Sequence, residues 1–106
     1  MTEAQWQGRV LDLAKLCGWR VAHFRPARTA AGWRTPVEAD GVGYPDLTMV
    51  REGRLIVAEL KSEAGRVTPE QRQWLAELSS VPGLEVFLWR PSDWPDVQRL
   101  LGRGAR

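Results

Sequence analysis

Two acids and a lysine are spaced along this sequence so that one β-hairpin would bring them together. Asp46 begins one short apolar run, and Glu59 and Lys61 end the next. Paired carboxylates bind hard cations such as Mg²⁺ or Mn²⁺, which prefer oxygen ligands. A neighbouring lysine can hold a water molecule or stabilise charge on a phosphate. Metal-assisted cleavage of a phosphodiester needs such a combination of two carboxylates and an amine.

The hairpin follows from the pattern around these residues. Two β-rich runs flank a turn in which Gly53 can adopt a positive φ. Residues 46–51 and 54–61 are therefore expected to pair antiparallel. Asp46 and Glu59 would then lie near the same open end of the hairpin.

Alternation along the second strand separates its polar and apolar side chains. Glu59 and Lys61 should project together while Leu60 enters the core. An acid and a lysine at this spacing often mark only a solvated face with a weak ion pair. The chain, however, has 13 Arg and only two Lys, and one of these is Lys61. An ammonium group is not interchangeable with a guanidinium, so a lysine at position 61 favours a catalytic role over a surface ion pair.

Three motifs follow one another in a specific order: GYPDL at 43–47, AELKS at 58–62 and TPEQRQWL at 68–75. In this order they resemble the PD-(D/E)XK nuclease superfamily. Within it, the chain is most similar to the small stand-alone VRR-NUC domains of phages and bacteria. The resemblance extends over nearly the whole chain, although the tract between Phe24 and Asp40 matches no family motif.

The resemblance implies a restriction-endonuclease-like core around a metal site. The matching catalytic positions are Glu3, Asp46, Glu59, Lys61 and Gln71. It implies that Asp46, Glu59 and the Leu60 carbonyl bind Mg²⁺ or Mn²⁺, that Glu3 helps through water, and that Lys61 orients the attacking water. Glu3 and Gln71 also have structural explanations, as a helix-start acid and as part of a capping box.

The activity implied is that of a metal-dependent DNA endonuclease. It would be structure-specific, acting on branched DNA such as four-way (Holliday) junctions, and a homodimer would supply the two paired cuts. One alternative is a DNA-binding nuclease-fold module that is inactive or needs a replication or recombination partner. A weaker alternative is a sequence-specific restriction enzyme, for which only residues 25–43 offer a recognition element.

Basic residues dominate one stretch, since no acid lies between Asp12 and Glu38. Basic patches beside an acidic cleft suit nucleic acid, although arginines can also simply keep a protein soluble. The candidates for DNA contact are His23, Arg25, Arg28, Arg34, Tyr44 and Ser62. For His23 a structural role is the simpler explanation, and for Tyr44 packing explains the residue equally well.

The chain of 106 residues is expected to form a single α/β domain. The expected order is α-β-β-β-α-β-α, with a small mixed sheet flanked by helices and a long basic loop at 25–43. Thr2 and Thr68 should cap helices that begin at residues 3 and 69. The lone Cys17 and the absence of a long apolar run suggest a reducing, cytoplasmic setting without a membrane span.

If the basic loop grips the DNA backbone, Arg28→Ala and Arg34→Ala should each weaken DNA binding. Each should also reduce the dependence of affinity on salt, because DNA binding releases fewer counterions when one phosphate contact is lost. A salt titration of DNA binding measures both effects. Unchanged affinity and salt slope in both variants would rule out this role for the loop.

Overall fold

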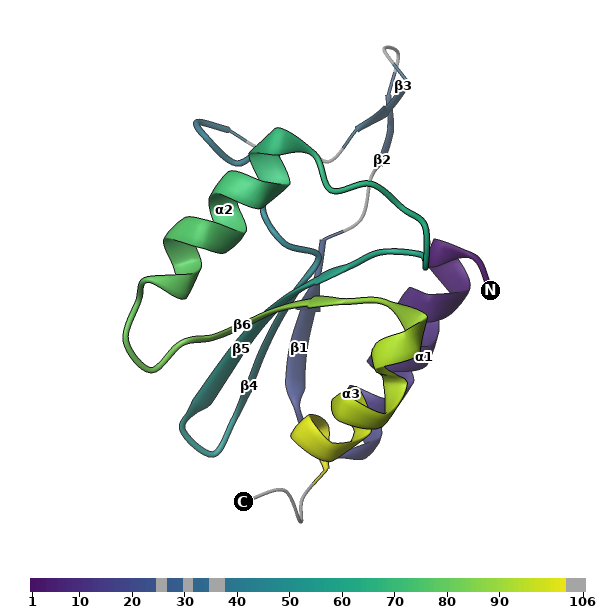
Figure 1. The fold of residues 1–106 in the computed structure, drawn as a ribbon, viewed down its shortest axis with the longest axis vertical. Helices are drawn as coiled ribbons and strands as arrows, with labels where there is room; N and C mark the ends of the chain where they lie inside the picture. The colour runs from purple at the N-terminus through teal and green to yellow at the C-terminus, as the bar shows by residue number, and fades with distance from the viewer. Residues whose placement is uncertain (25–26, 30–31, 35–37, 103–106) are drawn as a thin grey trace.

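Four strands form one mixed sheet, and a separate two-stranded hairpin stands beside it (Figure 1). The computed structural model describes residues 1–24, 27–29, 32–34 and 38–102. The elements are α1 (Glu3–Leu16), β1 (Arg20–His23), β2 (Ala27–Thr29), β3 (Gly32–Arg34), β4 (Leu47–Arg51), β5 (Arg54–Leu60), α2 (Pro69–Ser79), β6 (Glu85–Trp89), a short 3₁₀ turn η1 (Pro91–Asp93) and α3 (Trp94–Leu101). The helices and the strands of the main sheet confirm the expected order α-β-β-β-α-β-α.

The main sheet has the order β1-β4-β5-β6, with β4 antiparallel to both β1 and β5. The β4–β5 hairpin pairs Leu47 with Ala58 and Arg51 with Arg54, which confirms the predicted pairing. Its turn places Glu52 and Gly53 at φ values of 49° and 80°. Positive φ at both central residues is the geometry that matches the twist of a tight hairpin. β6 joins β5 in parallel after the crossover through α2.

One face of the sheet carries the core. Leu47 and Met49 of β4 and Ile56, Ala58 and Leu60 of β5 are fully buried on this face. They pack with apolar residues of α1 and α3, which lie together on this side (Figure 1). The helical residues of this core are Trp6, Val10, Ala14, Val97 and Leu101. The packing of these two helices therefore covers the apolar side of β5.

The opposite face carries the alternate residues of the same strands, including Val57 and Glu59. α2 lies over part of this face, and it contacts β6 and reaches Glu59 through a side chain of its first turn. Farther along, Val50 and Leu55 are 44% and 41% exposed, so the hairpin end of this face is uncovered. Leu60 and Glu59 thus lie on opposite sides of one sheet.

Both predicted helix starts are confirmed. The Thr2 hydroxyl accepts a hydrogen bond from the Gln5 main-chain N–H, and the Gln5 side chain accepts one from the Thr2 N–H. Thr68 and Gln71 form the same reciprocal pair at α2. No helix within the described ranges combines the length and the apolar character needed to span a bilayer.

The expected long loop at 25–43 is wrong in part, because it contains the β2–β3 hairpin, in which Arg28 pairs with Trp33. Each of its strands is only three residues long. Period-two alternation cannot be recognised over three residues, which is why the sequence pattern missed them. The final helix α3 has Asp93 as its N-cap, and a 3₁₀ turn precedes it.

A buried arginine joins the ends of three elements on the core face. Arg51, at the end of β4, is 8% exposed and donates to the main-chain oxygens of Cys17 (3.0 Å) and Leu101 (2.8 Å). Its guanidinium lies 4.6 Å from the centre of the Trp19 ring. The carbonyls at the C-terminal ends of α1 and α3 are thus satisfied by one cation, which also complements the helix dipoles.

Replacing this arginine by an apolar residue of similar length should therefore destabilise the fold. Arg51→Met should lower the free energy of unfolding by about 1.5–3 kcal/mol, the range for hydrogen bonds made by a charged group. Arg99→Met removes an exposed ion pair with Asp96 and should change it by less than about 0.5 kcal/mol. Urea unfolding followed by circular dichroism measures both, and equal small effects would contradict the assigned role of Arg51.

Candidate active site

Asp46 is fixed between two strands just before β4 begins. Its carboxylate oxygen Oδ2 accepts a hydrogen bond of 2.9 Å from the main-chain N–H of Leu60. Its carbonyl accepts another of 2.9 Å from the N–H of Phe24, which extends the pairing between β1 and β4. The preceding Pro45 is fully buried. The Asp46 side chain is therefore held against the last residues of β5.

Glu59 is a carboxylate buried on the α2 side of the sheet, with only 2% of its surface exposed. Its Oε2 accepts a hydrogen bond of 3.1 Å from Gln71 Nε2 and lies 3.7 Å from the ammonium of Lys61. Its other oxygen, Oε1, is buried and has no hydrogen-bond partner within the described residues. A buried carboxylate with one oxygen unsatisfied is costly unless something compensates it.

The two carboxyls perturb each other. Burial, and after it the charge of Asp46, raises the pKa of Glu59 to about 8. Burial also raises the pKa of Asp46, although the Leu60 N–H and the charges of Lys61 and His23 oppose this. Two like charges in one buried site disfavour each other, so burial and mutual repulsion both favour a proton on the pair.

A divalent cation fits this pair. It would bring the positive charge that two adjacent buried carboxylates lack, and it would give Glu59 Oε1 a partner. Within residues 1–24, 27–29, 32–34 and 38–102, no three His, Cys, Asp or Glu side chains gather in a metal-holding arrangement. A site here would therefore combine the two carboxylates with main-chain oxygen, which hard cations also accept.

Gln71 connects the start of α2 to Glu59. Its Oε1 accepts a hydrogen bond of 2.9 Å from the Thr68 N–H, while its Nε2 donates to Glu59. One side chain thus performs both tasks that the sequence suggested, capping the helix and reaching the carboxylate pair. Lys61 directly follows β5 and has only 11% of its side chain exposed, with its main-chain N–H bonded to the Trp89 carbonyl.

Two further candidates lie near the carboxylates. Glu3 is half-buried at the start of α1, and its charge contributes to the raised pKa of Glu59. His23 is half-buried at the end of β1, and its charge lowers the pKa of Asp46. Both therefore lie close enough to influence the pair electrostatically.

The remaining candidates lie at the margin of the site. Tyr44 packs edge-on between other aromatic rings, and its hydroxyl is 3.3 Å from Thr48 Oγ1. Ser62 follows Lys61 and is half-buried. Arg28 and Arg34 belong to β2 and β3, for which only the backbone is described, and Arg25 lies outside the described residues.

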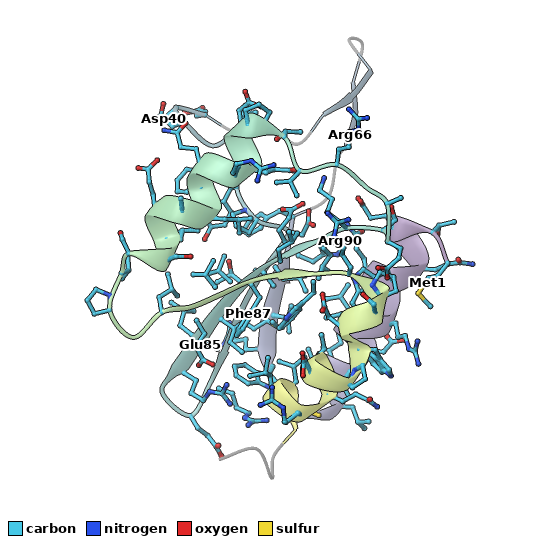
Figure 2. All side chains as sticks on the ribbon, in the orientation of Figure 1. Met1, Asp40, Arg66, Glu85, Phe87 and Arg90 are labelled. Atoms are coloured by element: carbon cyan, nitrogen blue, oxygen red, sulfur yellow. The ribbon has the colours of Figure 1, made fainter. Side chains whose placement is uncertain are left out.

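Sequence reasoning missed Arg90, which follows β6. Its Nη1 donates to the carbonyls of Ser62 (2.7 Å), Glu63 (3.2 Å) and Gly65 (2.8 Å). It therefore fixes the loop that leads from Lys61 toward α2, and Figure 2 shows its place beside that loop. No local signal could have revealed this, because the contacts span 25–28 residues of sequence.

A surface hollow beside α2 is a different feature. It is lined on one side by Asp40 and Val42 and on the other by Glu70, Trp74 and Glu77. None of the predicted site residues lies in it, and its three carboxylates would repel phosphate. This hollow is therefore not the candidate active site.

Comparison with known families agrees with this geometry. The sequence model of the VRR-NUC domain matches residues 8–90, which include Asp46, Glu59, Lys61 and Gln71. The chain belongs to the VRR-NUC domain family. This family is part of the PD-(D/E)XK nuclease superfamily, so the domain is of a nuclease type that acts on DNA and generally uses divalent metals. Neither the curated proteins nor the solved structures contain a significant match to the chain.

The raised pKa of Glu59 in this VRR-NUC domain predicts a specific pH dependence of stability. The folded state keeps a proton that the unfolded chain releases, so the free energy of unfolding should fall as pH rises from about 4.5 to about 8. The decrease should be on the order of 3–5 kcal/mol, since one pKa unit corresponds to about 1.4 kcal/mol. Glu59→Gln should lose most of this dependence and exceed the wild type in stability above pH 8.

Urea unfolding in the presence of a chelator, repeated across this pH range, measures the effect. Asp12→Asn removes an exposed carboxyl on α1 and should follow the wild type at every pH. The explanation fails if Glu59→Gln and wild type show the same pH profile.

Proposed function

We propose that this chain is a Mg²⁺- or Mn²⁺-dependent endonuclease that hydrolyses DNA phosphodiester bonds, with branched DNA such as a four-way junction as its substrate. The observation that carries this proposal is the buried Glu59 carboxyl beside Asp46, contacted by Lys61 and Gln71. A fold gains nothing in stability from burying two adjacent carboxyls, so such a pair is typical of a functional site.

Asp46, Glu59 and the Leu60 carbonyl would hold the cation, with Glu3 assisting through water. When bound, the cation supplies Lewis-acid polarisation of the phosphate and stabilises the charge on the leaving 3′ oxygen. The Leu60 N–H keeps the Asp46 carboxylate in place, and Gln71 does the same for Glu59. The protein's contribution is thus a pre-positioned pair of oxygen ligands.

Lys61 orients or activates the water that attacks phosphorus and offsets negative charge that develops on the phosphate. Its ammonium is held 3.7 Å from Glu59 Oε2 in a mostly buried position, where water screens its charge little. Arg90 keeps the following loop in place and so limits the freedom of Lys61. Gln71 completes the set by fixing the orientation of Glu59.

His23, Arg25, Arg28, Arg34, Tyr44 and Ser62 are the proposed DNA contacts around this centre. The carboxylates of the hollow beside α2 disfavour the approach of DNA over that part of the surface. A small domain has little surface with which to grip a long duplex, and a homodimer would present two active sites for paired cuts in a branch. A replication or recombination protein is the proposed partner in the cell.

Cleavage of a labelled four-way junction, a linear duplex and a single strand tests this function. With Mg²⁺ or Mn²⁺, wild type should cut the junction symmetrically, and a chelator should abolish cutting. Lys61→Ala should reduce the rate by at least about 10²–10³-fold, as loss of a key electrostatic group does. Lys15→Ala, which removes the other lysine from the exposed end of α1, should leave it unchanged.

Three outcomes would contradict the proposal. Tight junction binding without cleavage under any condition would favour a binding module or a nuclease that waits for a partner. Cutting that follows sequence rather than branching would favour a restriction-type enzyme. Full activity in Lys61→Ala would remove the proposed mechanism.

A further inference from the structure

Gly43 lies directly against the first turn of α2. Its φ is +87°, a conformation that side chains with a Cβ rarely adopt. A Cβ at this position would be 2.7 Å from the carbonyl carbon and the Cβ of Glu70, and 2.8 Å from the main-chain nitrogen of Gln71. Cβ atoms essentially never make contacts this short. Two of the neighbouring atoms are helix backbone, and the third is a Cβ fixed to that backbone, so none can rotate away. Only glycine permits this approach.

Residues on both sides of Gly43 also contact α2, through the Tyr44 ring and the Asp40 main-chain carbonyl. The Tyr44 ring packs edge-on against Phe24 (5.6 Å between centroids) and against Trp74 of α2 (5.1 Å). Trp74 Nε1 donates a hydrogen bond of 2.9 Å to the carbonyl of Asp40. We call these five residues, Phe24, Asp40, Gly43, Tyr44 and Trp74, the clasp. The clasp attaches the segment before Asp46 to the start of α2.

The position of this attachment matters because both joined parts carry site residues. Asp46 lies three positions after Gly43, and the atoms that a Cβ at Gly43 would meet belong to Glu70 and Gln71. Gln71 Nε2 in turn donates to Glu59, while Asp46 accepts from the Leu60 N–H. The clasp therefore closes a ring of contacts from the 40–46 segment through α2 to Glu59 and back through β5 to Asp46.

We propose that Gly43 is a positioning residue, which lets the start of α2 approach closely enough for Gln71 to fix Glu59 beside Asp46. This inference rests on the proposed function for its catalytic meaning, but the contact itself exists without metal or DNA. Gly43 touches no substrate and acts only through Gln71. The other residues of the clasp hold the 40–46 segment against α2, and the missing Cβ of Gly43 allows the close approach.

The first test observes Gln71 directly, in the protein without metal or DNA. The side-chain amide of Gln71 gives nitrogen–proton NMR signals that are identified by their absence in Gln71→Ala. In wild type they should be shifted from free-glutamine positions by the hydrogen bond to Glu59. In Gly43→Ala they should move to those positions, because the helix start is pushed away.

Gly53→Ala is the matched control. Gly53 has φ +80°, nearly the same as Gly43, yet a Cβ there meets nothing within 4 Å. Both variants carry the strain of a left-handed residue, so only the close approach distinguishes them. Gly53→Ala should leave the Gln71 signals in place. Unchanged Gln71 signals in a folded Gly43→Ala, or equal displacement in both variants, would overturn the proposal.

Trp74→Phe decides the question if Gly43→Ala does not fold. This change keeps an aromatic ring, although a smaller one, and removes the hydrogen bond to the Asp40 carbonyl. It should shift the Gln71 signals part of the way toward the free positions, and unchanged signals would overturn the proposal.

A cycle of nuclease rates then links the contact to catalysis. Gly43→Ala and Gln71→Ala should each slow cleavage by about tenfold, and the double variant should be no slower than the slower single one, because both remove the same contact. Independent, multiplying effects would overturn the proposal. If wild type cleaves no DNA, the proposed function fails, but the NMR comparison still decides the role of Gly43.

Discussion

The site depends on one unfavourable arrangement, the burial of the Glu59 carboxyl beside that of Asp46. Desolvation and mutual repulsion raise the pKa of Glu59 to about 8, so the metal-free fold keeps a proton there. The fold offsets this cost only in part, through the Leu60 N–H on Asp46 and through Gln71 and Lys61 on Glu59. What remains uncompensated is negative charge on the pair, and a divalent cation is the ligand that we propose for it.

The rest of the structure can be understood as the means of holding this pair together. The register of β4 and β5 places Asp46 and Glu59 at the same end of the hairpin. The apolar face packed against α1 and α3 holds the strands together. Leu60 is buried on this face, so Glu59 and Lys61 face the other way. Arg51 and Arg90 are cations with structural duties, since they satisfy carbonyls at helix ends and in the loop after Lys61.

α2 differs from the other helices, because none of its residues is fully buried. Besides its contacts with β6, it is attached at its first turns, where Gln71 reaches Glu59, Trp74 donates to the Asp40 carbonyl and Gly43 allows a close approach. The contacts at its first turns are suited to orienting the Gln71 side chain. Glu70 and Glu77 of this helix add negative charge to the hollow beside α2, which contains neither Asp46 nor Glu59.

The sequence by itself determined much of this protein. Local patterns predicted the hairpin, both capped helices, the element order and the motif that places the chain among VRR-NUC domains, because turns, caps and strand alternation depend on residues close together in the chain. It did not reveal the β2–β3 hairpin, whose strands are too short for any pattern, or the contacts of Arg90. Only the tertiary structure decided that Glu59 is almost fully buried, that one Gln71 side chain bonds Thr68 and Glu59 at once, and that a Cβ at Gly43 would clash with α2. Each of these depends on how closely separate elements approach one another, a distance set by the packing of the whole domain and not by any local stretch of sequence.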